Sequence, residues 1–156
     1  MRVITGTARG RRLKEPQGMD IRPTTDKVKE SMFSILQFDI EGRRVLDLFG
    51  GTGQLGIEAL SRGASEVVFV DKSAAALKLI RENLELCGLS DRARVRNGDS
   101  LAYLRSGEKF DLVFLDPPYD TGLLEQALQD IAGFDICREH GIITVSYTHL
   151  TLPTIC

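Results

Sequence analysis

From Arg44 onward, short apolar runs alternate with segments whose apolar residues have helical spacing. The apolar runs fit buried strands and lie at residues 45–49, 66–70, 93–96, 110–115 and 141–145. Helical segments separate them at about residues 54–61, 73–87, 100–105 and 123–132. This order predicts a doubly wound α/β fold, with a mostly parallel sheet covered by helices on both faces. A site is then expected at the carboxyl ends of the strands, where the strand order reverses.

The first part of the chain has a different character, because basic residues are in excess there. Residues 1–44 contain ten Lys/Arg and six Asp/Glu, whereas residues 45–156 contain ten and sixteen. We expect a small β-hairpin around a glycine-containing turn at residues 2–14, then a helix from Thr25 or Asp26 to about Gln37. Residues 1–14 form a basic arm without any acidic residue. This arm suggests contact with phosphates, and a solvated tail of ordinary charge explains it equally well.

Composition places few other limits on the chain. Of its 156 residues, 42% are hydrophobic, no apolar run is long enough for a membrane span, and the first residues lack the apolar core of a signal peptide. The three cysteines lie far apart in the sequence, at positions 87, 137 and 156. We therefore expect a reduced cytoplasmic protein with neither a disulfide framework nor a metal site.

The loop after the first strand is rich in glycine. It reads Asp47-Leu-Phe-Gly-Gly-Thr-Gly53, and glycines let a backbone turn tightly and approach a ligand closely. Gly51, Gly53 and Gly56 also fit the spacing of a dinucleotide fingerprint, so the loop alone is compatible with NAD.

Two acidic residues follow the second and third strands. Asp71 lies about twenty residues beyond the glycines, where a carboxylate can accept both hydroxyls of an adenosine ribose. Ser73 is available to cap the next helix in its place. Asp99 follows Asn97-Gly98 and fits two roles equally well, a contact with an adenine amine or a residue of the turn.

The motif after the fourth strand is the most specific of the four. Asp116-Pro117-Pro118-Tyr119 follows a buried apolar run. The prolines cannot extend a hydrogen-bonded ladder, so they direct the last carbonyls of the strand into the crevice. A carboxylate and a carbonyl can then accept both hydrogens of an NH2 group, and Tyr119 offers a flat face on which a base can stack. This array predicts a site that holds a planar amine.

These residues resemble the class I methyltransferases, specifically the N-methyltransferases with a (D/N/S)-P-P-(Y/F) motif. Within them, the chain resembles the RsmD-type 16S ribosomal RNA guanine-N2 methyltransferases. The closer resemblance is carried by residues 2–11, by Arg22-Pro23-Thr24 with Asp26, Lys29 and Glu30, and by residues 46–63. Gly50 stands where alanine is common in that family.

The resemblance implies S-adenosylmethionine as cofactor and a role for each motif. Asp47, Gly51 and Gly53 would form the methionine-side loop, while Asp71 would contact the ribose and Asp99 the adenine. Asp116, Pro117, Pro118 and Tyr119 would hold the target amine. RNA contacts are expected from the residues Arg2, Arg9, Arg11, Arg12, Arg22 and Thr24. The implied partner is ribosomal RNA within a small-subunit particle. The protein is expected to act as a monomer, with no bound metal and no contact with a membrane.

The last residues depart from the family. In the family that the chain resembles, a seven-stranded sheet ends in an antiparallel hairpin, whereas residues 146–156 do not resemble that ending, and no Asp, Glu, Lys or Arg follows Glu139. We expect the hairpin to be missing and the fifth strand to form an open edge. The predicted division is an amino-terminal unit at 1–40, an incomplete cofactor-binding domain at 41–145 and an unrelated tail at 146–156.

Three other functions remain open at this stage. The same amine-holding array would serve a DNA base or a protein glutamine amide, although the basic arm favours nucleic acid. An NAD-binding module is compatible with the glycines and Asp71, but Asp116 to Tyr119 argue against it. An inactive RNA-binding fragment would account for the unusual ending.

Overall fold

A computed structural model describes residues 1–17, 26–117, 122–147 and 150–156, and for residues 146–155 the backbone alone is described. The helices are α1 (Asp26–Leu36), α2 (Gln54–Ser61), α3 (Ala74–Cys87), α4 (Ser100–Tyr103) and α5 (Leu123–Gly133). The strands are β1 (Arg44–Leu48), β2 (Glu66–Asp71), β3 (Ala93–Asn97), β4 (Phe110–Leu115), β5 (Cys137–Tyr147) and β6 (Leu150–Ile155). Short 3₁₀ turns lie at Ser90–Arg92 and Leu104–Ser106.

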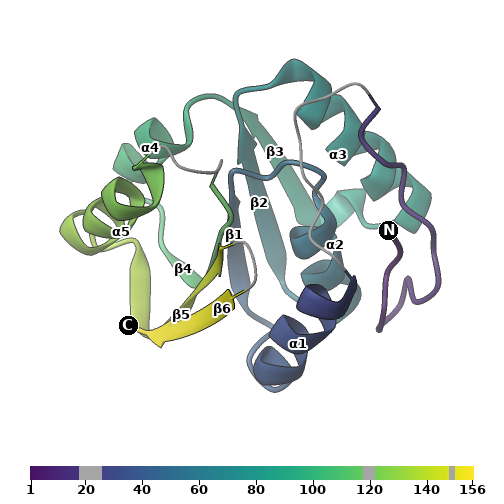
Figure 1. The fold of residues 1–156 in the computed structure, drawn as a ribbon, viewed down its shortest axis with the longest axis horizontal. Helices are drawn as coiled ribbons and strands as arrows, with labels where there is room; N and C mark the ends of the chain where they lie inside the picture. Colours follow the sequence, from purple (N-terminus) through teal and green to yellow (C-terminus); the bar gives the residue numbers. More distant parts are fainter. Residues whose placement is uncertain (18–25, 118–121, 148–149) are drawn as a thin grey trace.

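The six strands form one sheet in the order β3-β2-β1-β4-β5-β6. The first five are parallel, and β6 runs antiparallel to β5 (Figure 1). The strand order reverses between β1 and β4, which are neighbours in the sheet although most of the domain separates them in sequence. The predicted doubly wound, mostly parallel fold is therefore confirmed.

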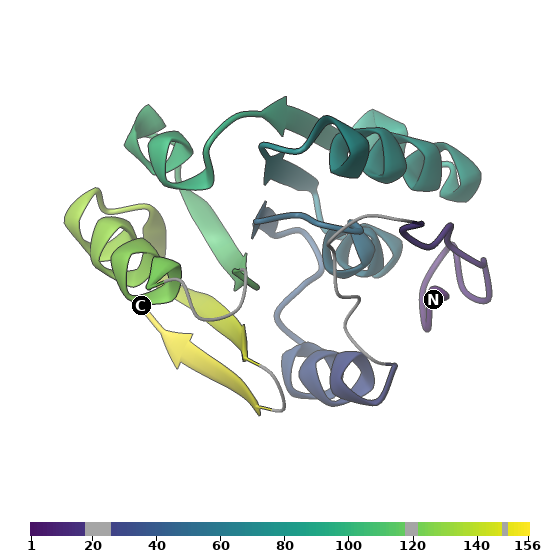
Figure 2. The same cartoon turned by 45° about the horizontal axis from the view of Figure 1, so that its top comes forward.

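Successive side chains of each strand point to opposite faces of the sheet, so the core consists of two layers. Val45 of β1 packs with residues of α1, α2 and α3, whereas Leu46 and Leu48 pack with residues of α4 and α5. The first three helices thus cover one face of the sheet and the last two cover the other (Figure 2). Both faces are buried, which explains the nearly continuous apolar runs in the sequence.

The basic arm is folded against the domain. Val3, Ala8 and Leu13 are buried in the same core layer as α1 and α2. The main chain of Lys14 exchanges hydrogen bonds with the side-chain amide of Asn83 on α3, at 2.7 and 3.2 Å. The solvated-tail interpretation is therefore wrong for the backbone of this segment. The expected hairpin is reduced to a single antiparallel bridge between Arg2 and Arg12.

The carboxyl-terminal end differs from expectation in two respects. First, Leu150–Ile155 pair with β5, so the prediction of an open edge at the fifth strand, with no antiparallel neighbour, is wrong. The alternating Leu and Thr residues suit a strand, and Pro153 is compatible with the outermost position in the sheet. Second, this pairing brings Cys156 back to the start of β5, where it forms a disulfide with Cys137. The expectation of cysteines without a disulfide is therefore also wrong.

The fit of the arm on α2 can be tested at two glycines of the same turn. Both have positive φ, +94° at Gly6 and +83° at Gly10, but a Cβ at Gly6 would overlap the carbonyl oxygen of Ser61, whereas a Cβ at Gly10 meets nothing within 4 Å. We expect Gly10→Ala to lower the free energy of unfolding by about 1–2 kcal/mol, from the left-handed backbone alone. Gly6→Ala should cost about 1–3 kcal/mol more, because the arm must move off the helix. Urea unfolding measures both variants, and equal losses would contradict this packing.

Candidate active site

The carboxyl ends of β1, β2 and β4 meet at one edge of the sheet. Leu48 at the end of β1 lies opposite Val70 of β2 on one side and Leu115 of β4 on the other. The residues that follow these positions are Phe49, Asp71 and Asp116. The structure therefore brings together the first, second and fourth of the predicted motifs, at the point where the strand order reverses.

The glycine loop after β1 is held to β2 by hydrogen bonds from its backbone. The amide of Gly50 donates to the carbonyl of Val70 at 2.9 Å, and the amide of Gly51 donates to Oδ2 of Asp71 at 3.0 Å. The loop contains three residues with positive φ, which are Gly51 at 60°, Gly53 at 78° and the non-glycine Phe49 at 62°. A non-glycine residue in the left-handed region is strained, and strain of this kind is concentrated at functional loops. No local sequence pattern predicts the left-handed backbone of Phe49.

Asp47 is a buried carboxylate next to this loop. Its side chain is on the face of the sheet that α2 covers, where Oδ2 accepts a hydrogen bond from the amide of Gly56 at 3.1 Å. Only 2% of the residue is exposed. Burial raises the pKa of Asp47 well above its ordinary value, and the negative charges of Asp116 and Asp71 raise it further, against the effect of the Gly56 amide. A cationic group bound here would relieve that repulsion.

Asp71 and Asp99 both bind backbone amides. Besides Gly51, Asp71 accepts from the amide of Ser73 through Oδ1 at 2.9 Å. Ser73 itself caps α3, as expected, by accepting from Ala76. Asp99 caps α4 through Oδ1, which accepts from the amides of Leu101 and Ala102. The turn role of Asp99 is thus present in the structure, and the predicted contacts of both acids with a ligand stay predictions.

The structure describes the first two residues of the amine-holding motif. Asp116 and Pro117 follow β4 directly and are half-buried. Pro118 and Tyr119 lie outside the described residues, as do Arg22 and Thr24. The structure therefore places the acidic end of the motif beside the glycine loop, while the stacking role of Tyr119 stays a prediction.

The predicted RNA-binding arginines of the arm point to solvent. Arg2, Arg9, Arg11 and Arg12 are all exposed, although the backbone between them is docked on the domain. The arm therefore presents four guanidinium groups from a fixed backbone.

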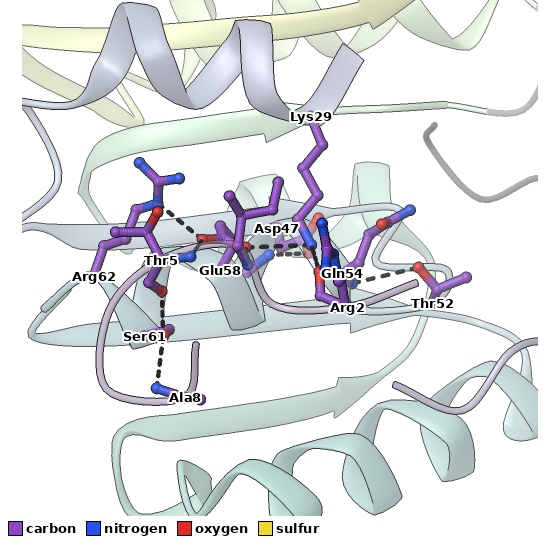
Figure 3. Close-up of polar contacts among 12 residues, drawn as sticks. Arg2, Thr5, Ala8, Lys29, Asp47, Thr52, Gln54, Glu58, Ser61 and Arg62 are labelled. Carbon is purple, nitrogen blue, oxygen red and sulfur yellow. Dashed lines mark hydrogen bonds and ion pairs between the residues drawn. The ribbon is translucent and has the colours of Figure 1, made fainter. Parts of the chain in front are cut away.

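One polar cluster was missed from the sequence. Lys29 of α1 and Glu58 of α2 form an ion pair at 3.3 Å, with both side chains fully buried (Figure 3). A signal was present, because Lys29 lies on the apolar stripe of α1 that also carries Met32, Phe33 and Leu36. A charged residue in such a stripe needs a buried partner.

Comparisons with known proteins agree with this arrangement. Residues 1–156 match the family described as conserved hypothetical protein 95. The ribosomal RNA small subunit methyltransferase D of Haemophilus influenzae is 41% identical over 149 residues, which are 93% of this chain and 77% of that protein. Its namesake from Escherichia coli is 35% identical over 157 residues, covering 99% and 79%. The solved structure of yhhF from Escherichia coli superposes with a TM-score of 0.85 at 36% identity, covering 99% of this chain and 85% of that one.

The buried charge of Asp47 predicts a stability effect. Asn at this position still accepts a hydrogen bond from Gly56 but buries no charge, so Asp47→Asn should raise the free energy of unfolding at pH 7 by about 1 kcal/mol or more. The corresponding rise in melting temperature is about 2–4 °C for a domain of this size. Asp47→Ala, which loses the acceptor as well, serves as the control and should gain less.

The same substitution should change the pH dependence of stability. The pKa of Asp47 is raised in the folded state, so folded protein holds a proton at pH values where the unfolded chain has lost it. The parent therefore gains stability from this group as the pH falls from 7 through the raised pKa towards the ordinary value near 4. Asp47→Asn lacks that gain, so the difference between the two melting temperatures should shrink on acidification. A constant difference between pH 7 and pH 5 would argue against a raised pKa.

Proposed function

Since the chain belongs to the family described as conserved hypothetical protein 95, together with the methyltransferases D compared above, we propose that it methylates the exocyclic N2 amine of a guanine in 16S ribosomal RNA. The enzyme class, a ribosomal RNA methyltransferase, is that of its relatives. We propose in addition which methyl donor the enzyme uses, which base it modifies and which residues make the contacts. The observation that carries them is the position of Asp116-Pro117 at the end of β4, next to the glycine loop of β1.

We propose S-adenosylmethionine as the methyl donor, which when bound supplies an electrophilic methyl group on a sulfonium ion. The acidic surroundings of Asp47 suit the positive charges of this molecule. Asp47, Gly51 and Gly53 would hold its methionine end, where the left-handed glycines keep the backbone free of side chains.

The adenosine end would be held by the two acids that follow β2 and β3. Asp71 would accept the ribose hydroxyls and Asp99 the adenine amine. Each carboxylate oxygen has two lone pairs, so the backbone amides that Asp71 already binds leave it able to accept further donors.

Asp116 would act on the target amine rather than on the cofactor. A guanine N2 amine carries two hydrogens, and a carboxylate and a neighbouring carbonyl that accept them orient the nitrogen lone pair. Holding the amine in line with the methyl group accelerates the reaction mainly by positioning and by preorganised polar contacts. Pro117 and Pro118 would direct the carbonyl, and Tyr119 would stack on the base.

The arm would supply contacts with the RNA backbone. Arg2, Arg9, Arg11 and Arg12 are exposed on a docked segment, and Arg22 and Thr24 follow it in sequence. We further propose that the substrate lies within a small-subunit particle in the cytoplasm and that the enzyme acts as a monomer. The relatives named for small-subunit RNA support this choice over a DNA base or a protein amide.

The division of the chain into residues 1–40, 41–145 and 146–156 also remains a proposal. The tail lacks Asp, Glu, Lys and Arg, although its backbone completes the sheet as β6. Activity should therefore be assayed in this chain and in one whose residues from 146 onward carry the corresponding sequence of the Haemophilus influenzae relative. Activity of the second chain alone would support a tail that is foreign to the protein.

The role of Asp116 predicts a loss of chemistry without a loss of RNA binding. Asp116→Ala should lower the single-turnover rate of methylation by roughly 100-fold or more, because a preorganised contact with the amine is removed. RNA affinity should stay close to that of the parent. The matched control is Asp130→Ala, an acid on the surface helix α5 that bonds Gln126. Methylation by Asp116→Ala at the parent rate would rule out the amine-holding role.

The role of the arm predicts a change in salt dependence. Arg9, Arg11 and Arg12 replaced together by Ala should weaken RNA binding and reduce the slope of log affinity against log salt by about 0.7–0.9 per lost phosphate contact. The charge-matched control replaces Arg105, Lys109 and Arg138, which contact Phe134, Asp135 and Asp111 away from the arm. If both triple variants show the same slope, net charge rather than the arm determines RNA binding.

A further inference from the structure

The arm, α1 and α2 meet at one buried ammonium group. Lys29 of α1 has no exposed surface, and its Nζ lies 3.3 Å from Oε1 of Glu58 and donates to the carbonyl of Arg2 at 2.8 Å (Figure 3). Burial lowers the pKa of Lys29, and the neighbouring Glu58 opposes that shift. The lysine therefore joins a residue of α2 to the beginning of the arm.

Glu58 binds the arm as well as the lysine. Its Oε1 accepts from the amide of Ile4 at 2.8 Å, and its Oε2 accepts from the amide of Thr5 at 3.0 Å. Arg62, one turn further along α2, donates to Oε2 through Nε at 2.9 Å. One fully buried carboxylate thus binds two cations and two backbone amides, which is the saturation a buried charge requires.

A second contact fixes the arm at the end of the same helix. The hydroxyl of Ser61 donates to the carbonyl of Thr5 at 2.6 Å and accepts from the amide of Ala8 at 2.9 Å. The arm is therefore attached to α2 on both sides of its Gly6 turn. Helix α2 begins at Gln54, immediately after the glycine loop. The helix that follows the candidate cofactor loop is thus also the support of the basic arm.

A purely stabilising role explains this cluster poorly. Well-packed apolar residues in place of a buried ion pair are often as stable or more so, because the pair must overcome the desolvation of both charges. Apolar contacts are not directional, whereas the amides of Ile4 and Thr5 donate hydrogen bonds to the two oxygens of one carboxylate, which Lys29 and Arg62 hold in place. A segment that is ordered on folding does not lose the same conformational entropy when it binds RNA.

We propose that Lys29 and Glu58 are positioning residues that hold the basic arm in one ordered position on α2, the helix that follows the cofactor loop, so that RNA binds an arm that is ordered in advance. This inference rests on the proposed RNA methyltransferase function. In this proposal Lys29 affects RNA binding through the position of the arm and does not contact the reacting atoms.

The position of the arm can be measured without any activity. In Lys29→Met, hydrogen exchange of the Ile4 and Thr5 amides should accelerate about tenfold or more, while exchange in β1 and β2 stays at the parent rate. The matched control is Arg92→Met, because Arg92 donates to the carbonyl of Leu60 at 3.0 Å and thereby also stabilises α2. In that control we expect no selective acceleration in the arm.

Kinetics then separate positioning from stability. Lys29→Met should raise the KM for RNA about tenfold, with kcat at saturating RNA and affinity for S-adenosylhomocysteine within about twofold of the parent. Lys29→Arg keeps the charge and the donors and should restore the KM. If Lys29→Met does not fold, the charge-neutral double variant Lys29→Met/Glu58→Gln takes its place, with the same rise in KM expected.

Each outcome decides one of the two proposals. If neither this chain nor the chain with the Haemophilus influenzae ending methylates ribosomal RNA, the proposed function fails, while hydrogen exchange still tests the anchoring of the arm. If the parent is active but the KM of the Lys29 variants equals that of the parent, the positioning role is wrong. An equal rise in KM for Arg92→Met would also overturn it, since loss of stability would then account for the effect.

Discussion

The proximity of Asp47, Asp71 and Asp116 depends on the pairing of β1 with β2 on one side and with β4 on the other. Parallel pairing places the carboxyl ends of neighbouring strands side by side, and the register opposes Leu48 to both Val70 and Leu115. Asp71 and Asp116 are therefore adjacent to the loop that follows β1, although they lie 45 positions apart in sequence. A shift of β4 by one residue would turn Leu112 and Phe114 to the opposite core layer, so the packing of both faces protects this register.

The proximity of these acidic side chains is electrostatically unfavourable in the protein without a ligand. Asp47 is buried, and Asp71 and Asp116 add negative charge around it, so its pKa is raised. The strained backbone of Phe49 lies in the same loop. Buried like charges and strain are both unfavourable for folding and are common at sites prepared for a ligand. A bound cation would reduce the first of these costs, which fits the sulfonium and ammonium groups of the proposed cofactor.

Much of this arrangement could be predicted from local sequence. The apolar runs of β1, β2 and β4 are long enough to indicate buried parallel strands, and Ser73 caps α3 as expected. Because strands and helices alternate, the order of the motifs along the chain was sufficient to place the starts of all four at one edge of the sheet. Local patterns suffice here because periodicity and capping depend on neighbouring residues alone.

The features that escaped prediction depend on contacts between distant parts of the chain. Glu58 binds amides that lie 53 and 54 positions away, and no local pattern indicates that a basic segment will dock on a particular helix. The same holds for β6, whose residues suit a strand but whose partner is decided by the edge that β5 presents. The disulfide was missed for that reason, because Cys137 and Cys156 become neighbours only once β6 is paired.

The arm shows how a segment rich in positive charge can be part of a rigid domain. Its apolar residues Val3, Ala8 and Leu13 enter the core, and its backbone amides bind Glu58 and Ser61 on α2. The arginines between them remain exposed and charged. A flexible basic tail would lose conformational entropy on binding RNA, whereas a docked arm has lost most of it on folding. In the proposed function, the buried ion pair of Lys29 and Glu58 would contribute by ordering the arm before RNA binds, even where its net contribution to stability is small.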